Sequence, residues 1–258
     1  MPIPRAPEPA IAATPSRRAP PRAQSALAAL SAATNRCREC PIGAGATQSV
    51  IGEGRPGARL MLVGEQPGDQ EDVQGRPFVG PAGRLLDRAL GALSWSREAV
   101  FVTNAVKHFK YELRGKRRIH KTPAQREVEA CLHWLEDEIA LVRPEAIVAM
   151  GATAARALLG RPIGVTGERG HWLEREADAR QVLITLHPSA LLRVLPAQRD
   201  ETFALWLRDL ALASAFARGA DGLAPEGPVR SAPRAPAPAA RHAPTARASA
   251  RGSRRGDR

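Results

Sequence analysis

The sequence predicts an α/β fold: a single-domain three-layer sandwich around a central, mainly parallel four-stranded sheet. Four short apolar runs alternate with helical patterns, which is the order expected of parallel strands joined by helices. Each run is about one strand long and stops at a glycine or a polar residue. Aromatic residues make up only 4% of the 258 residues, so Ala, Leu and Val must fill the core.

The first half of the chain contains one predicted strand. Its elements are a helix over 26–34, a CxxC motif at 37–40, a Gly-rich connection to 57, a strand over 59–63, a turn at 64–68, a polar loop over 69–77 and a helix over 84–93. The strand reads RLMLV and stops at Gly64, as a buried strand does. The leucines of the 84–93 segment recur at helical spacing, which places them on one face.

The second half contains the other three predicted strands. Its elements are a strand over 100–104, a helix over 123–142, a strand over 146–151, a helix over 153–159, a strand over 181–185 and a helix over 199–216. Pro123 begins the long helix, a position where proline is tolerated. The alternation continues to residue 216, so we expect one folded domain over residues 26–216.

The two ends of the chain carry most of its charge. The formal net charge is +12, and residues 218–258 hold nine arginines against three acidic residues. Both ends are rich in Pro, Ala and Arg without hydrophobic periodicity, so we expect disordered basic tails over 1–25 and 217–258. Such tails either tether the protein to nucleic acid by counterion release or reflect the composition of the proteome.

The segment 107–131 is the most unusual part of the sequence. Its run RGKRRIHK places five fixed positive charges around His120, within residues 114–121. A basic run of this kind is either a solvated loop or a surface that faces a polyanion such as DNA. Cys131 closes the segment and is one of only three cysteines in the chain.

Polar residues follow three of the predicted strands. Glu65, Asn104 and His187 each fall at or just past the end of an apolar run. Because parallel strands end at one edge of a sheet, these side chains are expected to converge there, where open α/β sheets bind ligands. The alternative is that strand ends are polar simply because loops are hydrated.

Several motifs, in this order, resemble the uracil-DNA glycosylase superfamily. They are GEQPG at 64–68, PFVG at 77–80, TNAVK at 103–107 and HPS at 187–189 with Arg193. The resemblance covers roughly residues 30–215. Within the superfamily, the motifs are similar to those of the iron–sulfur branch, family 4. Two departures, His108 in place of a cysteine and the KRRIH insertion, resemble the UdgX group, which captures uracil-DNA covalently.

The resemblance implies a metal centre. Cys37, Cys40 and Cys131 supply three thiolates, and His108 lies where the family has its fourth ligand. A [4Fe–4S] cluster is the implied cofactor. Zinc suits a Cys3His set equally well, so a structural zinc is the alternative.

The resemblance also implies how uracil is bound. Phe78 would stack on the extruded base, and the turn that begins at Gly64 would bind one edge of it. The Asn104 amide can accept from uracil N3–H and donate to O4, a pattern that cytosine reverses. Glu71 is a candidate for the wall that excludes the methyl group of thymine.

Bond breaking and DNA contacts follow from the same resemblance. His187 would donate a hydrogen bond to uracil O2 as negative charge develops there. Ser189 and Arg193 would grip the flanking phosphates, with Leu191 and Leu192 able to insert where the base leaves the stack.

Three functions remain open. His120 is expected to attack the sugar and trap the protein on DNA, with Glu65 and Gln66 orienting it. DNA binding is assigned to the basic residues of the run: Lys116, Arg117, Arg118 and Lys121. The alternatives are a conventional multi-turnover family 4 glycosylase and a non-catalytic iron–sulfur DNA-binding module.

The expected partner is uracil-containing DNA, single-stranded or with the base flipped from a duplex. No apolar run reaches the ~20 residues that span a bilayer, and no secretory signal is recognised. We therefore expect no membrane association and a cytoplasmic monomer of bacterial type, associated with the nucleoid when bound to DNA.

Overall fold

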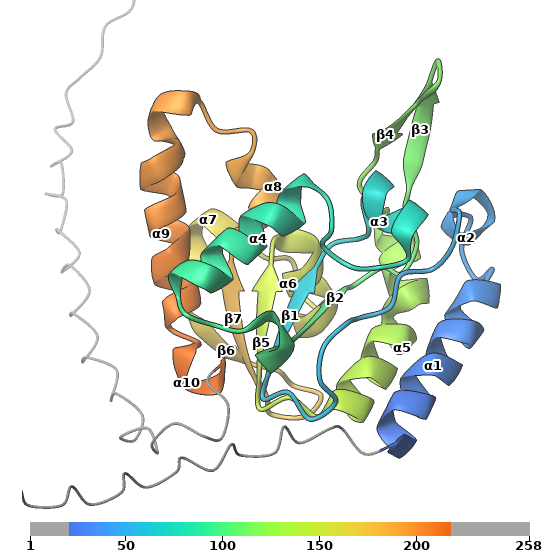
Figure 1. Ribbon diagram of the computed structural model, residues 1–258, viewed down its shortest axis with the longest axis horizontal. Coiled ribbons are helices and arrows are strands. Elements are labelled where there is room, and N and C mark those ends of the chain that lie inside the picture. Colours follow the sequence, from blue (N-terminus) through green and yellow to red (C-terminus); the bar gives the residue numbers. More distant parts are fainter. Residues whose placement is uncertain (1–20, 218–258) are drawn as a thin grey trace, which may run out of the picture. The chain divides into compact units, whose positions relative to one another are not determined.

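The computed structural model describes residues 21–217 (Figure 1). A five-stranded sheet in the order β2-β1-β5-β7-β6 forms its centre. The strands are β1 (Leu60–Gly64), β2 (Val100–Asn104), β5 (Ala146–Met150), β6 (Trp172–Glu174) and β7 (Gln181–Thr185). Four of them run parallel, and β6 pairs antiparallel with β7. The α/β class and all four predicted strands are confirmed.

Helices cover both faces of the sheet (Figure 1). The longer ones are α1 (Pro21–Arg36), α4 (Pro81–Ala92), α5 (Gln125–Val142), α6 (Ala152–Leu159) and α9 (Arg199–Ala211). Alternate strand residues point to opposite faces, so two separate cores form. Leu62 and Val148 pack with α4 and α9, whereas Val63 and Ala149 pack with α5 and α6. This is the predicted three-layer sandwich.

Short elements complete the fold. They are α2 (Ile42–Gly45), α3 (Asp69–Gln74), α7 (Val165–Glu168), α8 (Pro188–Leu191), α10 (Ser214–Ala217) and two 3-10 turns, Arg97–Ala99 and Pro196–Gln198. The loop predicted over 69–77 therefore contains a helical turn, α3. Strand β6 was not predicted, because three residues are too short to show an alternating pattern.

The basic run forms a hairpin rather than a loop. Strands β3 (Tyr111–Arg114) and β4 (Arg117–His120) pair antiparallel, with Arg114 opposite Arg117. The connection needs a residue with positive φ, and Gly115 supplies it at +60°. The hairpin extends on the side of the sheet where the parallel strands end, as does α8 (Figure 1).

The predicted tails fall largely outside the described residues, which leave out 1–20 and 218–258. Helix α1 begins at Pro21, five residues before the predicted start of the folded domain at residue 26. No described helix has the length and apolar character needed to cross a membrane.

Candidate functional site

Three side chains and one glycine meet where the parallel strands end. Gly64 and Asn104 are paired neighbours in the ladder of β1 and β2. Phe78 lies against Gly64, and the Phe78 and His187 rings are 5.9 Å apart. We call Gly64, Phe78, Asn104 and His187 the strand-end cluster. The positions of the strand ends predicted that Asn104 and His187 would converge, together with Glu65, whereas Phe78 came from the family resemblance.

Gly64 makes room for this cluster. A Cβ atom there would lie 2.5 Å from the Phe78 ring and 2.5 Å from Asn104 Oδ1, distances that real structures do not show. Phe78 itself has φ of +54°, unusual for an aromatic residue. Gly83 permits this conformation, because a Cβ atom on it would overlap the Phe78 carbonyl. Two glycines thus fix where the buried ring lies.

Two buried polar atoms of the cluster have no partner among the described residues. They are Asn104 Oδ1, an acceptor, and His187 Nε2. Buried polar groups are nearly always hydrogen-bonded, and leaving one unpaired costs about 1–3 kcal/mol. Both atoms are therefore available to a ligand, which would have to donate a hydrogen bond to Asn104 Oδ1.

The His187 ring is held in one tautomer. The backbone N–H of Ser189 donates to His187 Nδ1 at 3.2 Å, so Nδ1 is an acceptor and the proton of the neutral ring is on Nε2. Burial lowers the pKa of His187 to about 4, and the positive charges of His120 and Arg193 act in the same direction. Near neutral pH the unpaired Nε2 is therefore a neutral hydrogen-bond donor.

His120 lies beside Glu65 at the same edge. Its Nε2 is 3.5 Å from Glu65 Oε1, and the other carboxylate oxygen of Glu65 accepts a 2.6 Å hydrogen bond from Thr153. Burial lowers the pKa of His120, Glu65 raises it, and Arg193 lowers it further. Thr153 follows β5 at the start of α6, a strand end that the sequence analysis did not single out.

Two residues fix the base of the hairpin, and we call them the hairpin anchor. The amide of Gln66 donates to the Lys110 and Lys121 carbonyls and accepts from the Lys110 N–H, so it holds both strands. The other anchor residue is Arg118. Gln66, expected beside His120 in catalysis, thus uses its polar atoms on the backbone of the hairpin.

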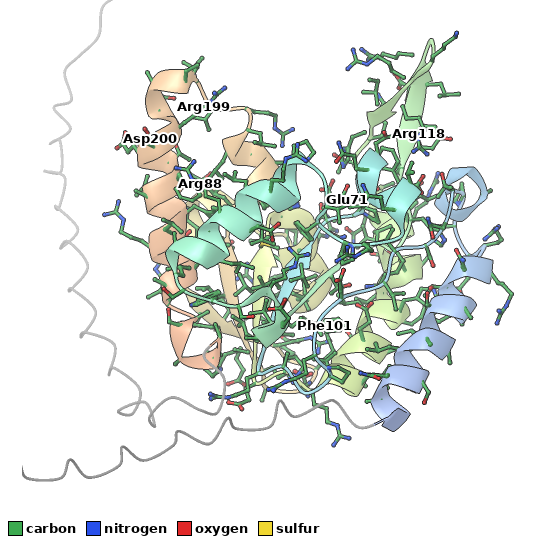
Figure 2. All side chains as sticks on the ribbon, viewed as in Figure 1. Glu71, Arg88, Phe101, Arg118, Arg199 and Asp200 are labelled. Atoms are coloured by element: carbon green, nitrogen blue, oxygen red, sulfur yellow. The ribbon has the colours of Figure 1, made fainter. Side chains whose placement is uncertain are left out.

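Arg118 departs from its predicted role at the DNA surface. Its guanidinium pairs with Asp69 and Asp72 at 2.6 Å each and lies over the Phe109 and Tyr111 rings. Figure 2 shows its position on the hairpin. Both acidic partners belong to α3, so Arg118 joins the hairpin to the domain. The charge of Arg118 is neutralised there.

The remaining predicted DNA contacts lie at the surface. Lys116 and Arg117, at the tip of the hairpin, are exposed. Lys121 pairs with Glu112 at 2.6 Å. The guanidinium of Arg193 lies 3.4 Å from the Ser189 hydroxyl.

The two leucines of the predicted wedge differ in exposure. Leu191 is buried in the core, whereas Leu192 is 44% exposed. Of this pair, only Leu192 is accessible to a base stack.

Glu71 also departs from its predicted role. Its two carboxylate oxygens accept from the backbone N–H groups of Gly68, at 3.1 Å, and Gly80, at 2.7 Å. The side chain is 7% exposed (Figure 2). Glu71, a candidate for the wall that excludes the thymine methyl, therefore uses both carboxylate oxygens to tie the 64–68 turn to the segment that carries Phe78.

The predicted metal ligands include Cys131 on α5 and Cys37, which contacts the same helix. Trp134 on α5 donates its indole N–H to Cys37 Sγ at 3.4 Å, and Lys107 donates its backbone N–H to Cys131 Sγ at 3.3 Å. Burial raises the pKa of Cys131 to about 11, with Cys40 and Cys37 adding to the increase. A thiol in this position becomes a thiolate only when a cation compensates the charge.

The imidazole of His108 completes the set. It is buried beside Gly43, where a Cβ atom would lie 3.4 Å from the ring. Burial lowers the pKa of His108, followed by the charge of Arg38, so the ring is held neutral as a metal ligand must be.

The donor types of this set suit more than one metal centre. Within residues 21–217, no three His, Cys, Asp or Glu side chains converge tightly enough to hold one metal ion. By chemistry alone, three thiols and an imidazole suit both zinc and an iron–sulfur cluster.

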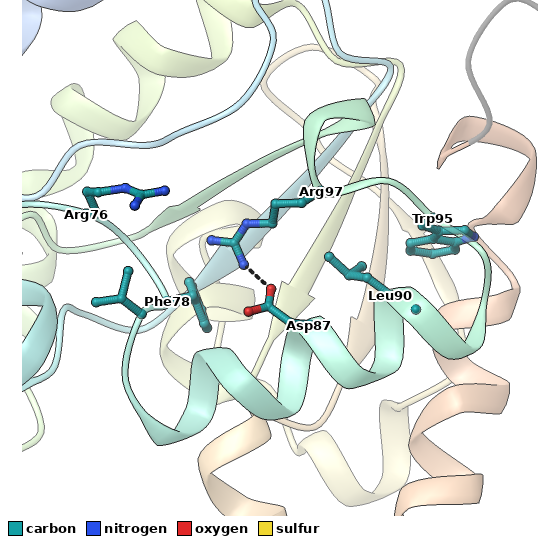
Figure 3. Close-up of a pocket in the computed structure, with 8 residues that line it drawn as sticks. Arg76, Phe78, Asp87, Leu90, Trp95 and Arg97 are labelled. Atoms are coloured by element: carbon teal, nitrogen blue, oxygen red, sulfur yellow. Dashed lines mark hydrogen bonds and ion pairs between the residues drawn. The ribbon is translucent and has the colours of Figure 1, made fainter.

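A cavity adjoins the strand-end cluster at Phe78. It measures about 480 Å³ and is lined by residues that include Arg76, Phe78 and Arg97 (Figure 3). Both guanidinium groups are already paired, Arg76 with Glu53 and Arg97 with Asp87. The cavity shares the Phe78 ring with the cluster but contains neither unpaired polar atom.

Fold and site together define an α/β protein whose strand-end edge presents buried hydrogen-bonding groups next to an aromatic ring and a basic hairpin. The chain belongs to the uracil DNA glycosylase superfamily, whose family model matches residues 51–211.

Relatives agree with this assignment. The type-4 uracil-DNA glycosylase of Thermotoga maritima is 37% identical over 185 residues, covering 70% of this chain and 89% of that protein. The type-4 enzyme of Pyrobaculum aerophilum is 40% identical over 182 residues, covering 68% and 87%. The type-5 uracil-DNA glycosylase of the same organism is 32% identical over 149 residues, covering 52% and 62%.

Proposed function

We propose that this protein recognises uracil in DNA, breaks its N-glycosidic bond and traps itself on the resulting sugar through His120. Membership of the superfamily and the names of the relatives support a uracil-DNA glycosylase function in DNA repair. The observation that carries the covalent step is the placement of His120 beside Glu65, with 3.5 Å between Nε2 and Oε1.

Base recognition rests on the unpaired acceptor of Asn104. Its Oδ1 accepts from uracil N3–H, while its NH2 donates to O4. Cytosine has no N3–H and carries a donor at C4, so both contacts fail, and the buried amide remains unpaired. The Phe78 ring, which lies against Gly64, stacks on the extruded base.

Bond breaking uses the neutral donor of His187. As the C1′–N1 bond lengthens, its electron pair moves onto uracil, and negative charge develops on O2. The Nε2–H of His187 donates to that oxygen without transferring its proton, as in an oxyanion hole. The sugar acquires oxocarbenium character at C1′, as in glycoside hydrolysis.

Capture uses the lone pair of the His120 ring. One ring nitrogen, deprotonated in the neutral form, bonds to C1′ as uracil leaves with the electrons of the C1′–N1 bond. The ring gains one positive charge, which the Glu65 carboxylate offsets, and the uracil anion takes a proton from solvent. Thr153 holds Glu65 in place through its 2.6 Å hydrogen bond.

A conventional multi-turnover glycosylase is the second candidate, favoured by the names of the type-4 relatives. In that case Glu65 positions a water molecule at C1′, and His120 does not react. The two candidates share the pocket chemistry and differ only in what reaches the sugar.

One experiment separates the candidates. The protein is mixed with a single-stranded oligonucleotide that carries one uracil, heated in SDS and run on a denaturing gel beside a thymine control. We expect a shifted band with uracil only, with the adduct mapped to His120 by mass spectrometry. His120→Ser should abolish the band, while Arg117→Ser, on the same strand, should retain it. Alkali-labile DNA without a shift would mean turnover, and intact unshifted DNA would mean a binding module.

We further propose that Cys37, Cys40, His108 and Cys131 hold a [4Fe–4S] cluster. It would supply the positive charge that the buried Cys131 thiolate needs and join the CxxC segment to α5. Iron and sulfide analysis of the purified protein tests this proposal, and stoichiometric zinc without iron would reject it.

The DNA strand is proposed to lie between the hairpin and α8. Lys116 and Arg117 on one side, and Ser189 and Arg193 on the other, would contact phosphates, with Leu192 inserted beside the extruded base. We also propose that the protein acts on DNA as a monomer in the cytoplasm.

A further inference from the structure

A completely buried ion pair lies beneath the strand-end cluster. Lys107 Nζ is 2.7 Å from Glu138 Oε2, and both side chains have 0% exposure. Burying two charges is expensive, and such a pair is weak support for stability by itself. The proposed chemistry uses neither Lys107 nor Glu138, which raises the question of which group the ion pair holds in place.

The ammonium group of Lys107 donates to two residues at the end of β2 as well as to Glu138. Besides Glu138, its ammonium donates to the Asn104 carbonyl at 2.6 Å and to Thr103 Oγ1 at 3.0 Å. An ammonium group has three protons, and three acceptors are present. Glu138 is fixed in turn, since it accepts from Thr103 and from the Gly52 N–H at 2.6 Å each.

Asn104 needs such a support because of its place in the sheet. Strand β2 is an edge strand and has a full strand partner only on its β1 side. Its other side makes an isolated bridge between Val102 and Glu53, two residues before Asn104. The Asn104 side-chain oxygen has no partner among the described residues, so the position of the amide depends on the main chain.

We infer that Lys107 is a positioning residue that fixes Asn104 for reading uracil, with Glu138 and Thr103 holding its ammonium in place. The inference rests on the proposed base-reading role of Asn104. Lys107 acts through the backbone carbonyl of Asn104 and does not itself touch the base. Its loss should weaken discrimination between bases more than it weakens DNA binding.

The same residue also contacts the proposed metal centre. Its backbone N–H donates to Cys131 Sγ at 3.3 Å, and His108 is its neighbour in the chain. A variant at Lys107 therefore could act through the metal ligands instead of through Asn104. The Thr103 hydroxyl instead bonds the ammonium of Lys107 and the carboxylate of Glu138, at the other end of the network.

The test measures base discrimination without cleavage. The probes are two single-stranded oligonucleotides, identical except for one 2′-fluoro-2′-deoxyuridine or one 2′-fluoro-2′-deoxycytidine. The 2′-fluorine withdraws electrons from the sugar and so destabilises the oxocarbenium-like transition state, which slows cleavage of the probe. The ratio of the two dissociation constants reports how well Asn104 reads the base, and iron content is measured on the same samples.

Two variants are compared with wild type. Thr103→Val keeps the shape and the ion pair but removes one contact of the ammonium, whereas the double variant Lys107→Met with Glu138→Gln removes both charges together. We expect the uracil-to-cytosine ratio to fall roughly three- to tenfold in the double variant and less in Thr103→Val. Iron content should not change in Thr103→Val.

Arg175→Met is the matched control. Arg175 is also a buried cation, held by Asp178, Glu136 and the Leu158 carbonyl away from the strand-end cluster. This variant should lower the unfolding temperature without changing the ratio. If the double variant does not fold, Thr103→Val alone carries the test.

The outcomes distinguish this inference from the proposed function. Folded variants with the wild-type ratio would overturn the role of Lys107. So would a ratio that falls only in samples that have lost iron, since the effect would then come through the metal ligands. Wild-type protein without any preference for the uracil probe would overturn the proposed function, and this inference with it.

Discussion

The strand-end cluster and the β3–β4 hairpin differ in how their side chains are held. Asn104 is buried and His187 half-buried at strand ends, where the sheet positions them and a buried ion pair supports Asn104. His120 is on an antiparallel hairpin that the hairpin anchor, Gln66 and Arg118, joins to the domain. Under the proposed function, base recognition is built into the fold, whereas sugar capture depends on a separable appendage.

If this division holds, the two regions can be disabled independently. Variants in the strand-end cluster should slow uracil release and capture together, because no sugar cation forms without bond breaking. Variants in the hairpin should change what happens to the sugar while uracil still leaves.

The largest effect is expected at His187. Replacing it with Ala removes the buried donor to uracil O2 and should slow uracil release by ~10²–10³-fold. Single-turnover uracil release from a single-stranded oligonucleotide measures this directly. His171→Ala is the control, because the His171 side chain is exposed and its Nδ1 lies 3.3 Å from the Glu168 carbonyl. Release at the wild-type rate in the His187 variant would remove this residue from bond breaking.

The next effect concerns the hairpin anchor. Arg118→Gln breaks two ion pairs, one to Asp69 and one to the completely buried carboxylate of Asp72, so the hairpin should lose its fixed position. Capture should fall roughly tenfold, the cost of one or more charged hydrogen bonds, while uracil release continues. The measured quantity is the ratio of adduct to free abasic DNA on one gel.

Arg117→Gln serves as the matched control for this experiment. It removes the same charge from the neighbouring, exposed position of the same strand. Equal effects of the two variants would mean that Arg118 acts as a DNA contact and not as an anchor.

The division also explains which features the sequence could predict. The four parallel strands were predicted because each is a short apolar run, and a run of this kind is a local signal. Asn104 and His187 followed, since they fall at or just past the ends of two such strands. Local chemistry and the order of elements were sufficient for these two residues, whereas Phe78 and Gly64 were assigned through the family resemblance.

The hairpin and the buried network depend on long-range pairing, which local patterns do not record. The charges of the basic run concealed its strand alternation, although Gly115 at the turn was a usable signal. Arg118 and Arg117 are alike in sequence, and only Asp69 and Asp72, more than 40 residues away, distinguish them. To predict Thr153 as a site residue, one would have to know that β5 ends beside β1.

A smaller effect is expected at Thr153. Thr153→Val keeps the shape but removes the 2.6 Å hydrogen bond that fixes Glu65. Capture should slow roughly fivefold, about the value of one net hydrogen bond, and Thr153→Ser should restore it. The rate of adduct formation under single-turnover conditions measures this. An equal loss in the Ser variant would point to packing of the methyl group instead of the hydroxyl.

The smallest effect is a shift in the pH dependence of capture. Only the neutral His120 ring can attack C1′, and burial lowers its pKa below the ordinary value of about 6.5. Capture should therefore stay constant through neutral pH and decline only as the pH falls through that lowered pKa. Because Arg193 lowers the pKa of His120 and Glu65 raises it, Arg193→Gln should move the decline to higher pH and Glu65→Gln to lower pH. Rates of adduct formation from pH 4 to 8, each normalised to its plateau, test this. Shifts in the same direction for both variants would mean that the decline reports a group other than His120.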